Sequence, residues 1–376
     1  MKQLKIGIAG LGISGTGTSR GTQIYKEFIK FPEVAVTAVM DPNPEALDLF
    51  TNQYDVDHAV KLYEELLMKD IDVVFISSPM QFHAPQAIQA LKKNIHVLSE
   101  VTAAQSLKEC QELLIAAKES EAQYMMAENY CFIRDNVAIK NMVKAGLFGE
   151  VYFAEGEYLH SVRDLHYHEG QPTWRKEYQV GKRGMTYGTH CLGPLLDWFE
   201  EPIDRVNCVG TGIHTYKEYQ TDDTTLLECK LKSGKLLKLR LDMVSKRPHN
   251  MAYYSLQGTK GCYEGPKHKG DYHKVWLEDF CKDTEEWLDL SEFYERYLPE
   301  EMVHLPEEAK GSFHWGADYF MIKSFIHSIV KGIPVPVDIH KSLAMTIPGI
   351  ISEQSIKDGG NFKKIPELNK QVEELQ

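Results

Sequence analysis

Three glycines near the beginning of the chain have the spacing that lets a backbone bind a phosphate. Gly10, Gly12 and Gly15 form a G-x-G-x-x-G pattern between a short apolar run and an amphipathic segment. This pattern is typical of a buried strand, a tight turn and a helix start, where free N–H groups and the helix dipole hold a pyrophosphate. We therefore expect Ile13 and Ser14, inside the turn, to contact the same group. Such turns also occur for packing reasons, so the neighbouring segments must decide.

The second apolar run, residues 34–40, ends at a carboxylate, Asp41. A carboxylate at this point of a nucleotide-binding fold accepts hydrogen bonds from ribose hydroxyls and repels a 2′-phosphate, which favours NAD over NADP. The interval from Gly15 to Asp41 is longer than usual, because residues 15–21 precede the first helical stripe. Asp41 has an alternative role as a helix N-cap ahead of Pro44, and one side chain can serve both purposes.

Polar or small residues also follow the later apolar runs of the first 130 residues. These segments are 77–83, 100–103 and 128–129. Ligands of a parallel sheet bind outside the carboxyl ends of its strands, so we expect Ser78, His83, Glu100 and Asn129 to contact the cofactor. His83 has the alternative of bonding a loop carbonyl. Asn129 either holds the ribose or carboxamide or braces its own turn.

Composition limits the class of protein. The 376 residues suffice for two domains with hydrophobic cores, and the formal charge of −12 argues against nucleic acid or an anionic membrane as a partner. Seven scattered cysteines without a C-x-x-C pair fit a reducing cytosol rather than a disulfide framework. No apolar run approaches the roughly 18 residues of a membrane span, and no signal peptide is apparent. We expect a cytoplasmic protein.

Helix-like and strand-like segments alternate through the first part of the chain. Apolar runs at residues 73–76, 95–98 and 124–126 predict buried strands, and amphipathic stretches such as 107–118 predict the helices between them. Strands that alternate with helices imply a parallel sheet with right-handed crossovers. The expected fold class is α/β, with residues 1–127 as a doubly wound, dinucleotide-binding Rossmann domain.

Neighbouring strands predominate from residue 128 onward. Residues 226–231 and 236–241 alternate apolar and polar side chains around a Ser-Gly pair, which predicts a hairpin. We therefore expect residues 128–376 to form an α+β domain with an open, mainly antiparallel sheet, whose last helix, near 342–357, can pack back on the first domain. The polar and aromatic stretch 265–312 is either a loop over the site or an oligomer contact.

Taken together, these segments resemble the Gfo/Idh/MocA oxidoreductases over nearly the whole chain. The resemblance is carried by the glycine turn, Ser77-Ser78-Pro79 with His83, and residues 90–100, 146–151 and 336–338. It implies a Rossmann domain joined to an open antiparallel domain that binds substrate and forms oligomer contacts, with the active site in the cleft between them. It also implies NAD as cofactor and a sugar, an inositol or a derivative as substrate.

Two departures separate this chain from typical dehydrogenases of that family. Val101 replaces the lysine that assists proton transfer, in a segment where Glu-Lys-Pro is usual, and Thr102 replaces the proline. Thr186 replaces the aspartate that usually lies four residues before the catalytic histidine, which is His190 here. Because valine cannot titrate, lysine-assisted hydride transfer is not expected.

Both departures resemble one branch of the family, the NAD-dependent glycosidases of glycoside hydrolase family 109. That branch shares Tyr187, Thr189 and His190, followed by Gly193-Pro194, and differs from this chain at Thr102, where it has proline. Other segments that look like the branch are 160–163, 174–175 and 314–319. The residues that we expect to contact substrate in them are Arg163, Trp174, Arg175, His160, His314 and Asp318. Their alternative is structural: packing of an interdomain loop, and a core position for the helix near Asp318.

The resemblance implies a redox mechanism. Removing hydride from a ring carbon requires a base for the hydroxyl proton beside the nicotinamide, and His190 is the candidate for this base or hydrogen-bonding group. Tyr187, with an ordinary pKa of about 10, needs a nearby cation to act as a base, for which Lys182, Arg183 and Arg163 are candidates. Oxidation at C3 of a glycoside would acidify the C2 proton and let the C1 substituent leave; water would add and the same NADH would return the hydride. A purely structural Tyr187–His190 pair is the alternative.

Three functions remain open from the sequence. They are an NAD oxidoreductase that recycles its cofactor to cleave a glycoside, a conventional NAD(P)-dependent sugar or inositol dehydrogenase, and a non-catalytic sugar or nucleotide sensor. No metal is expected, although His160, His166 and His168 with Glu169 have suggestive spacing, because they lie in an apparent loop and the redox route needs no Lewis acid. A homo-oligomer, dimer or tetramer, is expected because an open sheet needs cover.

Overall fold

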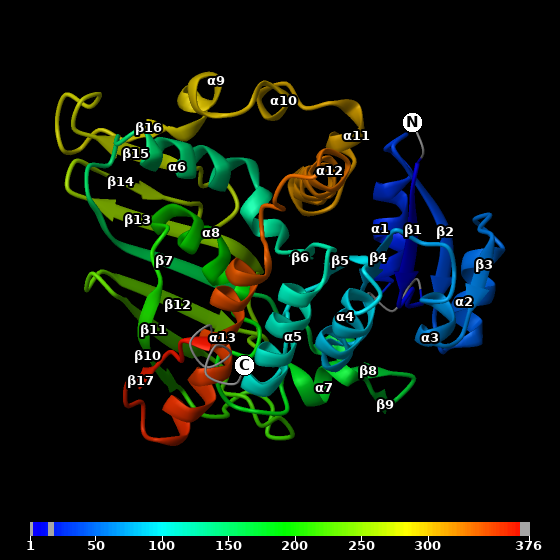
Figure 1. The fold of residues 1–376 in the computed structure, drawn as a ribbon. Coiled ribbons are helices and arrows are strands. Elements are labelled where there is room, and N and C mark those ends of the chain that lie inside the picture. The colour runs from blue at the N-terminus through cyan, green and yellow to red at the C-terminus, as the bar shows by residue number, and fades with distance from the viewer. Residues whose placement is uncertain (1–2, 14–18, 369–376) are drawn as a thin grey trace.

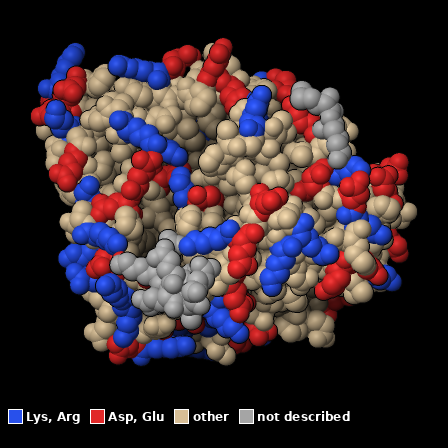
Figure 2. Space-filling view, in the orientation of Figure 1, with Lys and Arg blue, Asp and Glu red and all other residues tan. Residues whose placement is uncertain are grey.

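Two sheets organise the molecule, one in each half of the chain (Figure 1). The computed structural model describes residues 3–13 and 19–368, so the predicted cofactor contacts of Ser14 and Gly15 lie outside the described residues. Among the helices of the described part, none combines the length and apolarity that crossing a membrane requires. Figure 2 shows acidic and basic side chains interspersed over the face in view.

The first sheet has six parallel strands in the order β3-β2-β1-β4-β5-β6. Its strands are β1 (Leu4–Ala9), β2 (Val34–Met40), β3 (His58–Val60), β4 (Val73–Ile76), β5 (His96–Ser99) and β6 (Tyr124–Met126). The intervening helices are α1 (Arg20–Phe28), α2 (Pro44–Thr51), α3 (Tyr63–Leu66), α4 (His83–Leu91) and α5 (Leu107–Glu119). Strand β4 is buried along its whole length, as a parallel strand between two helical layers must be. The predicted doubly wound sheet is confirmed.

The second sheet has nine strands in the order β16-β15-β14-β13-β7-β12-β11-β10-β17. Its longer strands are β7 (Val151–Leu159), β10 (Ile203–Gly210), β11 (Thr225–Leu231), β12 (Leu236–Asp242), β13 (Asn250–Gly258) and β14 (Gly261–Glu264), and the short β17 (Lys363–Lys364) lies at one edge. Neighbours are antiparallel except for β12 and β7, which are parallel. The predicted mainly antiparallel sheet is confirmed, and so is the hairpin between β11 and β12.

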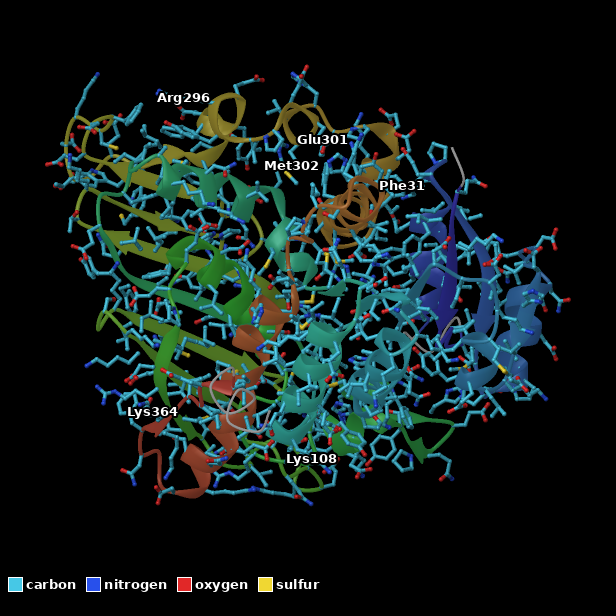
Figure 3. The ribbon with its side chains drawn as sticks, in the orientation of Figure 1. Phe31, Lys108, Arg296, Glu301, Met302 and Lys364 are labelled. Atoms are coloured by element: carbon cyan, nitrogen blue, oxygen red, sulfur yellow. The ribbon has the colours of Figure 1, made fainter. Side chains whose placement is uncertain are left out.

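Helices at the centre of the molecule join the two sheets. Helix α8 (Thr189–Phe199) packs on β7, and α13 (Ile339–Lys357) contacts both β10 and α5. The backbone N–H of Met126, at the end of β6, donates to Val337 O at 3.1 Å. Helix α12 (Ala317–Lys331) packs on α1, where Phe31 (Figure 3) contacts the ring of Tyr319 at 5.0 Å. Helix α13, the last long helix, therefore packs back on the first domain through α5.

Residues 265–312 extend the second sheet and then cross the outside of the molecule (yellow in Figure 1). They contain β15 (Lys274–Leu277), β16 (Leu288–Asp289) and the one-turn helices α9 (Tyr294–Tyr297), α10 (Glu300–Val303) and α11 (Glu307–Lys310). Hydrogen bonds from Asn141 to Tyr297 O and from Arg134 to Val303 O fix them on α6 (Arg134–Lys144). None of the described residues that line the cavities discussed below comes from this segment, so it is not the loop over the site that the sequence allowed.

Candidate active site

A polar cavity of about 210 Å³ lies where the carboxyl edge of the first sheet meets the second domain. The first domain contributes Arg20, Gln23, Ser77, Ser78, His83, Glu100 and Val101 to its wall. The second domain contributes Asn129, Tyr158, His160, Val162, Leu165, Trp174, Arg175, Gln179, Tyr187, His190, Met243 and His314. Most of the predicted site residues are therefore brought together, although they come from widely separated parts of the chain.

His190, in the first turn of α8, is oriented by a buried carboxylate. Its Nδ1 lies 2.7 Å from Oε1 of Glu128, which is fully buried. Because the carboxylate can only accept, Nδ1 carries the proton and Nε2 has the free lone pair. Tyr130 stacks on the imidazole at 4.2 Å, and the hydroxyl of Tyr254 donates to the carbonyl of His190 at 2.6 Å. This arrangement gives a fixed base whose positive form Glu128 would stabilise.

Two tyrosines flank the imidazole. The rings of Tyr158 and Tyr187 each lie 5.2 Å from that of His190 and 5.9 Å from each other. Burial raises the pKa of Tyr187 to about 12, although the cation of Arg175 opposes the shift, and burial also raises the pKa of Tyr158 well above its ordinary value. Both phenols are therefore protonated at neutral pH and act as hydrogen-bond donors. Tyr158 was not predicted, because nothing distinguishes it within the regular pattern of β7.

The cation beside Tyr187 is Arg175, and not one of the three candidate cations named from the sequence. Lys182 pairs with a glutamate of α13, Arg183 binds Asp222 at 2.8 Å, and Arg163 lies 3.8 Å above the ring of Tyr216. Arg163 does not line the cavity in the described part of the chain, so we no longer expect it to contact substrate. The guanidinium of Arg175 stacks on Trp174 at 4.4 Å, and its Nε is buried without a hydrogen-bond partner among the described residues.

An ionic network lies beneath the cavity. Arg20 donates to Glu100 at 2.7 Å and to both oxygens of Asp318 at 2.6 and 3.0 Å. Asp318 also accepts from Asn129 at 2.8 Å and from Nδ1 of His314 at 3.0 Å. Asp318 is fully buried and does not line the described cavity, so it positions Asn129 and His314 instead of contacting substrate itself. Glu100, expected at the cofactor, is held by Arg20 at the cavity wall.

The histidines of the suggestive H-x5-H-x-H spacing do not converge. The Nδ1 atoms of His160 and His249 lie 2.9 Å apart at the cavity wall, and burial lowers the pKa of His160 to about 4. His166 is buried and bonds the hydroxyl of Tyr219 at 2.8 Å, whereas His168 lies on an exposed hairpin. Among the described residues no group of three His, Cys, Asp or Glu side chains is arranged to hold a metal ion.

A second cavity, of about 440 Å³, begins at the glycine turn and is lined by Gly10, Gly12, Ile13 and Asp41. A Cβ atom on Gly10 would lie 2.6 Å from the backbone nitrogen of Ser78, so only glycine leaves the turn open there. Asp41 accepts from the N–H groups of Leu11 and Gly12 at 2.9 and 3.1 Å. Asn43 provides the N-cap of α2, so the N-cap role considered for Asp41 is wrong.

Ser77, Ser78, Leu165 and Trp174 line both cavities, so the two form one continuous cleft. The glycine turn and Asp41 fit the phosphates and adenosine ribose of a dinucleotide at one end, which leaves its nicotinamide for the end that holds His190. The ring nitrogens of His83 lie 2.9 and 2.8 Å from the carbonyls of Thr102 and Ser78. His83 therefore braces the loop, as its alternative interpretation proposed, while lining the cavity.

Comparison with known proteins identifies the family. Residues 4–128 match the NAD-binding Rossmann fold of the Gfo/Idh/MocA oxidoreductase family, and residues 136–264 match the C-terminal domain of the same family. The chain belongs to the Gfo/Idh/MocA oxidoreductase family. It is therefore an oxidoreductase with NAD as its cofactor, as predicted. Residues 206–372 also match the C-terminal domain of glycosyl hydrolase 109, which confirms the resemblance to that branch.

Individual relatives agree with this assignment. A glycosyl hydrolase family 109 protein of Saccharopolyspora erythraea is 28% identical, over 92% of this chain and 80% of its own. One of Shewanella pealeana is 25% identical, over 98% and 86%. Among solved structures, a levoglucosan dehydrogenase in complex with NADH and L-sorbose has a TM-score of 0.79 at 18% identity. The superposition covers 97% of this Gfo/Idh/MocA chain and 100% of the dehydrogenase chain. A scyllo-inositol dehydrogenase of Lactobacillus casei has a TM-score of 0.73 at 16% identity, with 97% and 98% covered.

Proposed function

We propose that this protein oxidises a ring hydroxyl of a glycoside and, with the same bound cofactor used in both directions, cleaves the glycosidic bond by elimination. The observation that carries the proposal is the proton-transfer group of the cavity. This group is His190, paired with Glu128. Val101 stands at the position of the family's lysine, and no lysine lines the cavity in the described chain. The relatives named glycosyl hydrolase family 109 proteins support the same reaction.

The side chains supply the acid–base chemistry of each step. A nicotinamide bound at this edge supplies reversible oxidation of one ring carbon. Nε2 of His190 accepts the proton of the hydroxyl at C3, and Glu128 stabilises the resulting imidazolium. The phenols of Tyr158 and Tyr187 donate hydrogen bonds to substrate oxygens. The guanidinium of Arg175, whose Nε has no hydrogen-bond partner among the described residues, stabilises negative charge that develops on them.

The C3 ketone acidifies the proton at C2. Loss of this proton and departure of the C1 substituent with the bonding electrons form a C1–C2 double bond. Water then adds across that bond, and reduction of the ketone restores the sugar. The electrons removed at C3 return to C3, so the net reaction is hydrolysis and consumes no external oxidant.

Aryl glycosides without added NAD test the proposal. The expected result is release of the phenol over many turnovers with no rise in absorbance from NADH, and a sugar product that carries deuterium at C2 when the reaction runs in D₂O. Stoichiometric accumulation of NADH with an oxidised sugar would identify a conventional dehydrogenase instead. Binding of sugar with neither outcome would favour a sensor.

We further infer a cytoplasmic location and a homo-oligomer. All seven cysteines are free, which suits a reducing compartment. The nine-stranded sheet is open, and a second copy is the simplest cover for such a sheet. Light scattering of the purified protein gives the oligomeric state, with a dimer or a tetramer expected.

A further inference from the structure

The cavity at the glycine turn has walls from both domains. On one side lie the ends of the parallel strands, together with Leu62 and Phe82. On the other lie Leu165, Tyr167, His168, Thr173 and Trp174 of the second domain. Tyr167 and His168 belong to a small hairpin, β8 (Tyr167–His168) and β9 (Gln171–Pro172), inserted between β7 and α8, and the other three flank it in sequence. Figure 1 shows this hairpin away from its own domain's sheet, next to the helices of the first domain.

The hairpin is preformed and anchored at its base. Glu169 and Gly170 have φ angles of 47° and 78°, the left-handed pair that a two-residue hairpin turn requires. The N–H of Thr173 donates to His166 O at 2.9 Å, and its hydroxyl donates to Leu165 O at 2.6 Å. The buried imidazole of His166 bonds Tyr219, which ties the base to the second domain. The hairpin therefore presents a fixed wall.

Partly exposed side chains with apolar or aromatic surface line both walls, and the ammonium of Lys176 lies 4.5 Å from the centre of the Tyr167 ring. Leu62 is 56% exposed, Phe82 is 47% exposed and Tyr167 is 37% exposed, and all three line this one cavity. A ribose or a phosphate would gain little from such surfaces, whereas a flat aromatic base gains by stacking between them. Asp41, suited to the adenosine ribose, lies in the same cavity.

We propose that the β8–β9 hairpin forms the outer wall of the adenine site, with Tyr167 covering the base from one side while Phe82 and Leu62 cover it from the other. The second domain thus holds the cofactor at its adenine end as well as at its reacting end. This proposal rests on the assignment of NAD and deepens the proposed function, because a cofactor that is recycled has no need to leave.

The rate at which NADH leaves the protein tests the role of the hairpin directly. This rate is measured from the change in NADH fluorescence after the NADH complex is mixed with excess NAD. Tyr167→Ala is expected to release NADH at least tenfold faster than the wild type, whereas Tyr167→Phe, which keeps the ring, is expected to stay within twofold. Tyr152→Ala is the matched control, because Tyr152 is 46% exposed on β7 and is not among the described residues lining either cavity. AMP affinity is expected to fall at least tenfold in Tyr167→Ala, with nicotinamide mononucleotide affinity unchanged.

Release of NADH from Tyr167→Ala at the wild-type rate would overturn the proposal, as would equal loss of AMP and nicotinamide mononucleotide affinity. Failure of the wild type to bind NADH or AMP would overturn it together with the cofactor assignment. Faster release from Tyr167→Ala in a protein that cleaves no glycoside would support the hairpin's role while the proposed function fails.

Discussion

The imidazole of His190 owes its chemistry to a carboxylate that lies 62 positions earlier in the chain. The sequence identified His190 through its resemblance to a known motif, and it placed Glu128 at the end of a strand. It could not pair the two, because their contact depends on how α8 packs beneath the segment that follows β6. Arg175 shows the same limit: its residue type suited a sugar site, but its position beside Tyr187 arises only in the folded chain.

Replacement of Glu128 tests the orientation of His190. In Glu128→Gln an amide no longer selects the tautomer or stabilises the imidazolium, so kcat is expected to fall about 10²- to 10⁴-fold with KM within a few fold. Glu155→Gln is the control, because Glu155 pairs with Lys238 on the second sheet away from the cavity and should keep wild-type turnover. Steady-state release of an aryl leaving group measures both variants. Unchanged kcat in Glu128→Gln would remove the assigned role.

A buried histidine predicts how stability depends on pH. Burial, with the nearby charges of Arg175, Lys176 and Arg163, lowers the pKa of His166 to about 4. The unfolded chain has its histidines near pKa 6.5 and takes up this proton first, so the free energy of unfolding falls as pH drops from about 6.5 to about 4.

In His166→Gln this contribution disappears. The fall in Tm across that pH range is then expected to be about 2–4 °C smaller than in the wild type. His160 has a similarly lowered pKa but is present in both proteins, so the difference isolates His166. Thermal melts at a series of pH values provide the measurement, and parallel Tm curves would contradict the assignment.

At the scale of elements, strands with a clear run or alternation of apolar residues could be predicted, whereas β3 and the one-turn helices could not. The bounds of β11 and β12 match the predicted ranges 226–231 and 236–241 to within one residue, because each strand alternates apolar and polar residues beside a clear turn. Strand β3 has three residues and the helices α9–α11 have one turn each, too few for any periodicity to appear. Pairing with β2 places β3, whereas α9 and α11 are placed by packing on α6 and α12.

The glycine turn was recognised, but the close approach of helix and strand is made by a different glycine. A Cβ atom on Gly21 would lie 2.1 Å from the carbonyl oxygen of Gly10, because the helix begins only at Arg20. Gly21→Ala must push α1 away from the turn. The expected loss is about 1–3 kcal/mol of unfolding free energy, with weaker binding of NADH.

Chemical unfolding and NADH titration measure these two effects. Gly311→Ala is the control, since a Cβ atom there meets nothing within 4 Å, and it should leave both quantities unchanged. Equal stability and NADH affinity in the two variants would show that the helix adjusts without strain.

At the scale of the whole molecule, one ionic network holds the two halves together at the cleft. Arg20 begins the helix after the glycine turn, whereas Asp318 lies in the first turn of α12, 298 positions later. Burial alone would raise the pKa of Asp318, but the charge of Arg20 and hydrogen bonds from His314 and Arg20 hold that pKa well below its usual range. Asp318 therefore stays ionised at every pH at which the protein works, and a contact of this range cannot be inferred from local sequence.

Asp318→Asn leaves Glu100 as the one described carboxylate that balances the charge of Arg20 in a buried setting. Removing one partner of a buried ion pair costs about 3–5 kcal/mol, and we expect a loss of this size in the unfolding free energy from urea titration. Glu112→Gln breaks the exposed pair between Lys108 and Glu112 and should cost less than about 1 kcal/mol. Since Asp318 also positions Asn129 and His314 at the cavity, folded Asp318→Asn should turn over more slowly as well. A urea midpoint no lower than that of Glu112→Gln would mean that packing of α12 on α1, and not the network, joins the halves.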